Sequence, residues 1–320
     1  MPDLLTVKGL TTRFRLSVGD VHAVNGVDFT VAEGETVAVV GESGCGKSVT
    51  ALSLLRLILP PGVITAGEIV FEGRDLLRLS DEEMQDIRGN RIAMIFQEPM
   101  TSLNPVFPIG RQIAEGLIIH RGVSRREALE EAERLLAQVG IPSPAERLRD
   151  YPHQLSGGMR QRVMIAMALA CKPRLLIADE PTTALDVTIQ AQILELMDRL
   201  REEHRMALLL ITHDLGVVAE RANRTLVMYA GQIVEEGPTG TLLTTPLHPY
   251  TEGLLASLPQ RSEPGRPLTT IPGHVPSLFG DLPGCGFCSR CPQKQWECDR
   301  ETPQLREITP GHRVRCWKYR

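Results

Sequence analysis

Short apolar runs alternate with amphipathic stretches along the chain. The runs 36–40, 175–178 and 208–212 have the length and composition of fully buried parallel strands. Two stretches open with a Ser-x-x-Glu capping box, at Ser80 and at Ser124, and each box predicts the start of a helix. Strands that alternate with helices in this way predict an α/β core around a mostly parallel sheet.

The amphipathic stretches also predict helix ends and buried faces. The helix from Ser80 is expected to end at Gly89 and the helix from Ser124 at Gly140, because glycine readily adopts the left-handed conformation that closes a helix. A third helix with one apolar face is expected over Ile189–Leu200. The buried positions expected in the second helix are Leu129, Ala132, Leu135, Leu136 and Val139.

The two ends of the chain have different patterns. Residues 4–40 predict several short strands, with a turn glycine, Gly26, between Val21 and Val31. After Thr244 the density of proline rises and the periodicity fades. We therefore expect a domain boundary near residue 240.

Composition and charge exclude several classes of protein. The chain has 320 residues and a formal net charge of −4, which argues against the broad basic surface of a general nucleic-acid binder. Its longest apolar stretches, Leu52–Pro61 and Ala207–Thr212, are too short or too interrupted to cross a bilayer. The first residues lack the basic and apolar regions of a signal peptide. We therefore expect a cytosolic protein that reaches a membrane only through partners.

Residues 41–48 match the phosphate-loop pattern G-x-x-x-x-G-K-[ST], between the strand 36–40 and an apolar helix expected from about Val49. Glycines let successive backbone N–H groups curl around a phosphate, and the helix N-terminus adds a favourable dipole. Lys47 is expected to neutralise charge on the β- and γ-phosphates, and the Ser48 hydroxyl to bind Mg²⁺. A plain glycine-rich turn is the alternative, and the strand–loop–helix context disfavours it. The residues expected to line the nucleotide here are Gly41, Ser43, Gly44, Cys45, Gly46, Lys47, Ser48 and Val49.

Two carboxylates, Asp179 and Glu180, directly follow the apolar run 175–178. The carboxyl ends of parallel strands form the edge at which open α/β sheets bind ligands. We expect Asp179 to hold Mg²⁺ through water, and Glu180 to orient or deprotonate the attacking water. The alternative is an acidic helix cap after a strand, and the presence of the phosphate loop favours the nucleotide site.

Between these two elements, residues 155–161 read Leu-Ser-Gly-Gly-Met-Arg-Gln and closely resemble the signature sequence of ABC ATPases. The resemblance implies that Ser156, Gly157 and Gly158 meet the γ-phosphate of an ATP held by the opposite subunit. It assigns the remaining elements to Gln97 (the Q-loop glutamine, near Mg²⁺ and water), Asp186 (the D-loop), His213 (the switch histidine at the γ-phosphate) and Phe14 (stacking on adenine, with a core position as the alternative).

The resemblance to ABC ATPases also implies the fold and its division. It implies an α/β P-loop NTPase (RecA-like) core with an antiparallel β-subdomain and an α-helical signature subdomain at about 98–170. The ATPase domain is expected over residues 4–240. A cysteine-rich C-terminal extension is expected over 241–320.

Three segments outside the catalytic motifs resemble the ATPases of oligopeptide and dipeptide importers: 97–105, 248–255 and 271–276. This narrower resemblance implies an ATP-hydrolysing subunit that energises peptide import. A nickel or sugar importer ATPase of the same family is the first alternative, and an exporter ATPase or a soluble ABC ATPase are the others. The implied partners are a paralogous ABC ATPase in a heterodimer, two transmembrane permease subunits and an extracytoplasmic substrate-binding protein, but no nucleic acid. The implied location is peripheral, on the cytoplasmic face of the cell membrane.

Seven cysteines are distributed unevenly, and five of them crowd the end of the chain. In a reducing cytosol, such clustering favours metal binding over disulfides. The family's four-cysteine pattern, which in some members holds a [4Fe–4S] cluster, matches Cys285, Cys291, Cys298 and Cys316. Zinc, or no metal, are the alternatives. Cys288 departs from the pattern and leaves the exact ligand set open.

Overall fold

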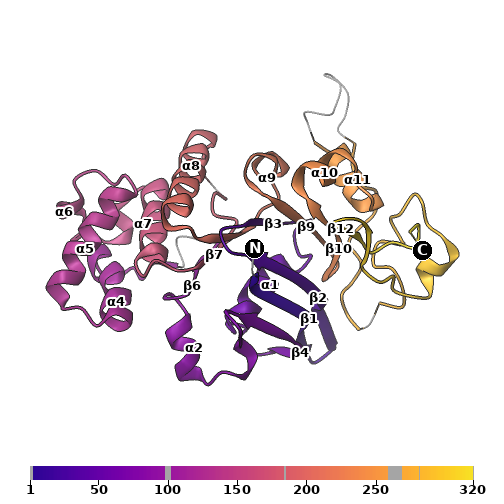
Figure 1. Cartoon of the computed structure of the whole chain (residues 1–320), viewed down its shortest axis with the longest axis horizontal. Coiled ribbons are helices and arrows are strands. Elements are labelled where there is room, and N and C mark those ends of the chain that lie inside the picture. The colour runs from indigo at the N-terminus through magenta and orange to yellow at the C-terminus, as the bar shows by residue number, and fades with distance from the viewer. Residues whose placement is uncertain (1–2, 98–101, 184, 259–268, 281, 320) are drawn as a thin grey trace. The chain divides into compact units, whose positions relative to one another are not determined.

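The computed structural model of the chain describes residues 3–97, 102–183, 185–258, 269–280 and 282–319 (Figure 1). The chain divides into two compact units. The phosphate-loop unit comprises residues 2–31, 36–77 and 211–320, and the helical unit comprises chiefly residues 32–35 and 78–210. Within the described residues, none of the helices combines the length and the apolar character that crossing a bilayer requires.

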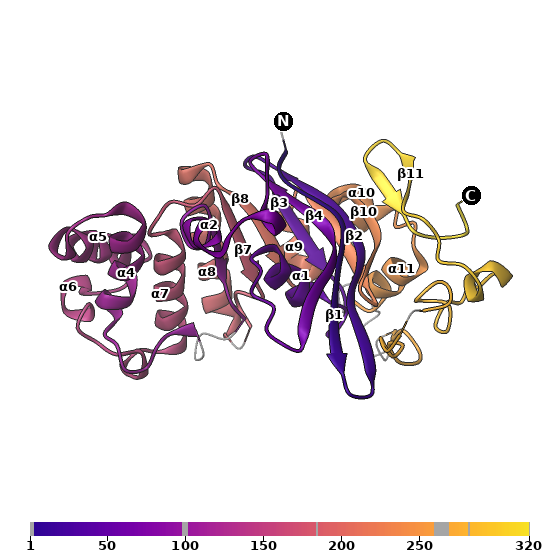
Figure 2. The ribbon, with the colours of Figure 1, turned by 90° about the horizontal axis from the view of Figure 1, so that it is seen from below.

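The phosphate-loop unit contains a four-stranded sheet in the order β2-β1-β4-β5. Its strands are β1 (Asp3–Leu16), β2 (Gly19–Ala32), β4 (Gly62–Phe71) and β5 (Arg74–Asp75). The expectation of several short strands before residue 36 was wrong, because β1 and β2 are long strands that form one ribbon (Figure 2). Gly26 has φ +62° inside β2, so it accommodates an irregularity within the strand and does not end it.

The second sheet of this unit has the strand order β11-β12-β10-β9-β3. β3 (Thr36–Val40) pairs in parallel with β9 (Arg224–Tyr229), and β10 (Gln232–Pro238) pairs antiparallel with β9. β11 (Arg306–Thr309) and β12 (His312–Val314) add an antiparallel pair beside β10. The sheet is therefore mixed: the expected parallel pairing is confirmed for β3 with β9, whereas β10, β11 and β12 pair antiparallel. The turn at residues 230–231, both with positive φ, makes the tight β9–β10 reversal possible.

Helices of the phosphate-loop unit are short. They are α1 (Lys47–Leu54), α9 (Leu215–Arg221), α10 (Thr239–Thr244) and α11 (Pro249–Ala256). One hydrophobic core joins β3 and β9 to residues far along the chain, including Tyr250, Leu255 and Phe287. The residues after 240 therefore contribute to the same core as the strands that flank the phosphate loop.

The expected parallel pairing is also confirmed in the helical unit, where β6 (Ile92–Ile95) pairs in parallel with β7 (Leu175–Asp179), and β8 (Ala207–Ile211) lies next to β7. The helices α4, α5, α6 and α7 gather in one bundle in Figure 1, where α4 and α5 both pack on α7. The helices of this unit are α2 (Asp81–Ile87), α4 (Ile109–Arg121), α5 (Arg125–Gln138), α6 (Pro144–Arg147), α7 (Gly157–Leu169) and α8 (Val187–His204).

Both capping boxes are confirmed. The Ser80 hydroxyl accepts a hydrogen bond from the Glu83 amide at 3.2 Å, and the Ser124 hydroxyl accepts one from the Glu127 amide at 3.3 Å. Gly89 and Gly140 have φ of +75° and +76° and follow the helix ends as expected. In α5 the buried face includes Ala128, whereas the expected Leu129 is only half-buried.

Candidate active site

The phosphate loop is a tight backbone arrangement that glycine makes possible. Gly41 and Gly46 have φ of +152° and +108°, in a region that L residues rarely adopt. A β carbon at Gly41 would lie 2.2 Å from the Met228 carbonyl oxygen, and one at Gly46 would lie 2.3 Å from the Ala23 carbonyl oxygen. The loop therefore packs against the backbone of β9 and β2, and only hydrogen fits at these two positions.

Lys47 is the first residue of α1, and only 6% of it is exposed. Its Nζ donates to the carbonyl oxygens of Gly41 at 2.7 Å and Glu42 at 3.0 Å. Cys45 is fully buried beside it, and burial raises the pKa of this thiol. The loop thus curls around the ammonium group of Lys47, which places one positive charge among the loop's amides, as an anion site requires. Cys45 is a neutral packing group.

Ser48 and Val49 follow Lys47 in the first turn of α1, where both are half-buried. Ser43 and Gly44 are exposed at the tip of the loop. The expected strand 36–40 is confirmed as β3, and the helix begins two residues before the expected Val49.

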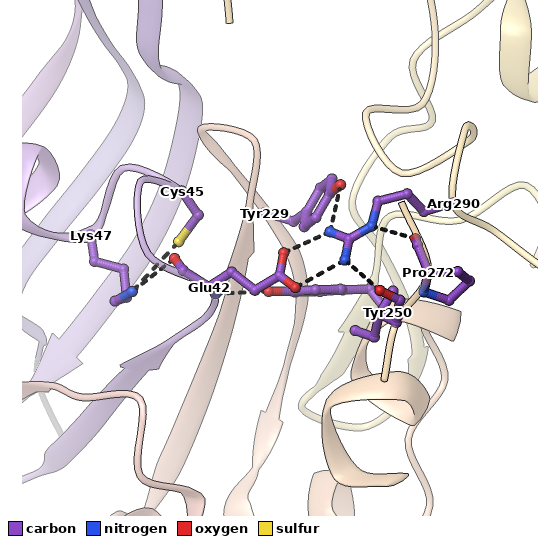
Figure 3. A network of polar contacts seen from close by, with 8 residues as sticks. Glu42, Cys45, Lys47, Tyr229, Tyr250, Pro272 and Arg290 are labelled. Atoms are coloured by element: carbon purple, nitrogen blue, oxygen red, sulfur yellow. Dashed lines mark hydrogen bonds and ion pairs between the residues drawn. The ribbon is translucent and has the colours of Figure 1, made fainter. Parts of the chain in front are cut away.

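Glu42 stands at a variable position of the phosphate-loop pattern and was not expected to have a role. Its carboxylate accepts two hydrogen bonds from Arg290, at 2.7 and 3.0 Å, and its amide donates to the Tyr250 hydroxyl at 2.8 Å (Figure 3). Arg290 lies 248 positions further along the chain. Because the sequence pattern assigns no side chain to position 42, only the folded chain identifies these contacts.

In the helical unit, β7 ends in Asp179, whose side chain is buried, and Glu180 follows it. Glu180 has φ +46°, a conformation that costs a non-glycine residue roughly 1–3 kcal/mol and is often retained at functional sites. Its Oε2 accepts hydrogen bonds from Gln97 Nε2 at 3.2 Å and from Thr183 Oγ1 at 2.8 Å. The fold therefore brings together two residues expected to act on water, although they lie 83 positions apart.

Ser156 caps the N-terminus of α7, and its hydroxyl accepts a hydrogen bond from the Met159 amide at 3.3 Å. Gly157 is exposed in the first turn, and a β carbon at Gly158 would lie 3.0 Å from Ile189 Cγ2 of α8. Asp186 caps α8 by accepting from the Ile189 amide at 2.9 Å. The expected signature segment and D-loop aspartate thus lie at the N-termini of two helices that pack together. Ala184, the first residue of the expected D-loop at 184–186, lies outside the described residues.

His213 and Phe14 lie in the phosphate-loop unit. His213 is exposed just after β8, between Thr212 and Asp214, and the Asp214 amide donates to the Thr212 hydroxyl at 3.0 Å. Phe14 is half-buried in β1 opposite Gly62, where a β carbon would lie 2.8 Å from the Phe14 ring. Stacking of Phe14 on adenine stays a prediction.

Four of the C-terminal cysteines lie within residues 285–298, called the cysteine segment, and Cys316 follows β12. The Cys285 amide donates to the Cys298 carbonyl oxygen at 2.8 Å, and burial raises the pKa of the Cys285 thiol to about 12. Burial also raises the pKa values of Cys288, Cys291 and Cys316. In the described part of the chain, which includes all five thiols, no three His, Cys, Asp or Glu side chains are placed to hold a metal ion. The described residues therefore give no support to the expected [4Fe–4S] cluster or zinc ion, and metal binding by these cysteines stays a prediction.

Two family models match separate parts of the chain. The family described as "ABC transporter" matches residues 24–183. The family described as "Oligopeptide/dipeptide transporter, C-terminal region" matches residues 234–298.

Similar proteins span nearly the whole chain. A protein of Sinorhizobium fredii named "Probable peptide ABC transporter ATP-binding protein" is 56% identical over 318 residues, which cover 98% of this chain and 95% of that protein. The "Dipeptide transport ATP-binding protein DppD" of Bacillus subtilis is 52% identical, over 99% of this chain and 95% of that protein. A solved structure of the dimeric ATP-binding cassette MJ0796, bound to ADP and Pi, matches with a TM-score of 0.66 at 30% identity, over 73% of this chain and 98% of that chain.

Proposed function

The chain belongs to the family of ABC transporter ATP-binding proteins, and from this premise we propose that it hydrolyses ATP to energise the import of dipeptides or oligopeptides. The hydrogen bond between Gln97 and Glu180 carries the catalytic part of this proposal. The match of residues 234–298 to the peptide-importer C-terminal region supports the substrate class. Import of nickel or a sugar is the alternative within the same family.

The phosphate loop binds the triphosphate in this proposal. The backbone amides of residues 43–48 and the N-terminus of α1 face the β- and γ-phosphates, and Lys47 exchanges its bonds to loop carbonyl oxygens for bonds to phosphate oxygens. The Ser48 hydroxyl and the Asp179 carboxylate are hard oxygen donors that suit Mg²⁺. The bound ion would neutralise charge on the β- and γ-phosphates.

Glu180 is the proposed general base. It takes a proton from the attacking water as the water oxygen bonds to the γ-phosphorus and the bond to the β-phosphate oxygen breaks, which releases ADP and phosphate. The hydrogen bonds from Gln97 and Thr183 hold the carboxylate in one orientation. We assign His213 to a contact with the γ-phosphate and Phe14 to the adenine ring.

The signature segment serves a second subunit in this proposal. Ser156 and the amides of Gly157 and Gly158 form the start of a helix that is free to meet a phosphate, as helix N-termini commonly do. Each ATP then lies between one phosphate loop and one signature segment, and Asp186 lies at the contact of the two subunits. The partner is a paralogous ATPase, with two permease subunits and a substrate-binding protein completing the transporter at the cytoplasmic face of the membrane.

The domain division follows the same scheme. Residues 4–240 form the ATPase domain, including a helical signature subdomain at about 98–170, and residues 241–320 form the importer-type extension. The proposed reaction assigns no step to the cysteine segment, in which burial raises the pKa values of Cys285, Cys288 and Cys291.

Replacing Glu180 with glutamine tests the catalytic assignment. The Glu180→Gln variant keeps its shape but cannot accept the proton, so ATP turnover should fall by roughly 10²–10⁴-fold while Mg-ATP binding is retained. Glu195→Gln, an exposed change on α8, is the matched control and should turn over ATP like the wild type. Phosphate release and the binding of a fluorescent ATP analogue are the two measurements. Turnover by Glu180→Gln at the rate of the control would refute the assignment.

A further inference from the structure

The phosphate loop is tied to the C-terminal extension through Glu42. Arg290 Nη1 and Nη2 donate to the two carboxylate oxygens of Glu42 at 2.7 and 3.0 Å, so the pair is bidentate (Figure 3). The Glu42 amide donates to the hydroxyl of Tyr250, in α11. Side chain and backbone of one loop residue are therefore both held by residues beyond position 240.

Arg290 is itself held firmly. Its side chain is only 5% exposed, and it donates to the carbonyl oxygens of Pro272 at 3.0 Å and Ile271 at 3.1 Å. Its Nη1 also lies 3.3 Å from the Tyr229 hydroxyl oxygen. The hydrogen bonds to Glu42 raise the pKa of Arg290, so the guanidinium stays charged. Because hydrogen bonds to carbonyl oxygens fix the planar guanidinium group, it can hold the carboxylate of Glu42 in one position.

An aromatic cluster supports the same contact. The ring centroids of Tyr229 and Tyr250 are 4.5 Å apart, and Phe287 lies edge-on to Tyr229 at 5.2 Å. Phe287 and Arg290 belong to the cysteine segment, Tyr250 to α11, and Tyr229 ends the strand β9 that runs beside β3. The packing places the cysteine segment against β9, the strand next to the one that leads into the phosphate loop.

We propose that Arg290 is a positioning residue for ATP binding, through which the C-terminal extension holds the phosphate loop in its nucleotide-binding conformation. The proposal rests on the proposed function and goes beyond it, because neither the phosphate-loop pattern nor the catalytic motifs include Glu42 or Arg290. To bind ATP, the loop must hold its backbone amides so that they point toward one site. Glu42 is the second residue after β3, at the start of the loop, so a contact at this residue fixes the start of the loop. Released from Arg290, the loop spends part of its time in other conformations, and the apparent affinity for ATP falls by that fraction.

The test measures Mg-ATP binding to the full-length chain by calorimetry, together with its melting temperature. Arg290→Gln and Glu42→Gln should each weaken binding about tenfold, which corresponds to about 1.4 kcal/mol. The double variant should be no weaker than either single variant, because both changes remove the same pair. In the assembled transporter, KM for ATP should rise about tenfold while kcat changes less than about twofold, because the pair does not contact the water or its base.

Arg315→Gln is the matched control. Arg315 is a second arginine of the extension that donates to backbone carbonyl oxygens, those of Ile233 at 3.0 Å and Pro303 at 3.1 Å, and these contacts lie outside the phosphate loop. This variant should lower the melting temperature and leave the affinity for ATP unchanged. Equal weakening of binding in Arg315→Gln and Arg290→Gln would mean a general loss of structure and would overturn the proposal.

Two further outcomes are decisive. If Arg290→Gln does not fold, Glu42→Gln alone decides: weaker binding at an unchanged melting temperature supports the proposal, and wild-type affinity overturns it. Wild-type affinity of Arg290→Gln also overturns it, while the proposed function stands. If the wild-type chain itself fails to bind Mg-ATP, the proposed function fails first, so the two failures are distinguishable.

Discussion

Two glycines of the phosphate loop, Gly44 and Gly46, allow a quantitative test of the loop geometry. Both have positive φ, +78° and +108°. A β carbon at Gly44 would have no heavy atom within 4 Å, whereas one at Gly46 would lie 2.3 Å from the Ala23 carbonyl oxygen and 2.8 Å from Met228 Cε. The two alanine variants therefore share a backbone penalty and differ in steric overlap.

The expected magnitudes follow from these contacts. The left-handed backbone costs an L residue roughly 1–2 kcal/mol, and at Gly44 this is the whole expected cost of the change to alanine. At Gly46 the added methyl must also displace the backbone of β2, and overpacking of this kind adds about 1–3 kcal/mol. Gly46→Ala should therefore lose about 2–5 kcal/mol of unfolding free energy, and Gly44→Ala about 1–2.

Urea denaturation of the nucleotide-free chain, followed by circular dichroism, measures both unfolding free energies. The slopes against urea should agree among wild type and variants, so that the midpoints report stability alone. Equal stabilities of Gly46→Ala and Gly44→Ala would show that the loop does not pack against β2 as described. The absence of nucleotide matters, because a methyl at Gly44 could alter phosphate binding without any effect on folding.

Two other predictions concern the helix cap and the buried thiols. Ser124→Ala removes the capping hydrogen bond to the Glu127 amide and should lower the unfolding free energy by about 0.5–2 kcal/mol, measured by the same denaturation; a change below 0.2 kcal/mol would contradict the cap. Burial raises the pKa of Cys285 from 9.0 to about 12, so the unfolded chain loses this proton at lower pH than the folded chain. The contribution of Cys285 to stability is therefore complete below about pH 9 and is lost as the pH rises toward about 12. The difference in unfolding free energy between wild type and Cys285→Ser should shrink over that range, and a constant difference would contradict the burial.

Local sequence patterns predicted the elements around the site well, because these elements are stabilised by interactions between residues that are close in the sequence. The run 36–40 has only buried positions and forms β3 with the expected bounds. The hydroxyls of Ser80 and Ser124 accept hydrogen bonds from backbone amides three residues further along the chain. Formation of these caps therefore does not depend on residues distant in the sequence. The carboxylates at the end of β7 and the serine before α7 follow for the same reason, since each is placed by the strand or helix next to it.

Features set by distant contacts were not predicted. Gly26 suggested a turn, but it lies within the long strand β2, where pairing with the neighbouring strand sustains the extended chain. Leu129 matched the apolar stripe of α5, whereas Ala128 is the more buried residue, because the small side chain suits close packing of helices. The bidentate ion pair joins Glu42, at a variable position of the phosphate-loop pattern, to Arg290, in a proline-rich region without periodicity. Neither local pattern therefore predicted the pair.

Peptide uptake by the native host tests the central claim most directly. A strain that lacks this chain is complemented with the wild type or with Glu180→Gln, and the uptake of labelled dipeptides and longer peptides is compared with the uptake of nickel and of sugars. The account predicts that peptide uptake is lost in the deletion, restored by the wild type and not restored by Glu180→Gln. Peptide uptake that persists in the deletion strain, or that Glu180→Gln restores fully, would contradict it.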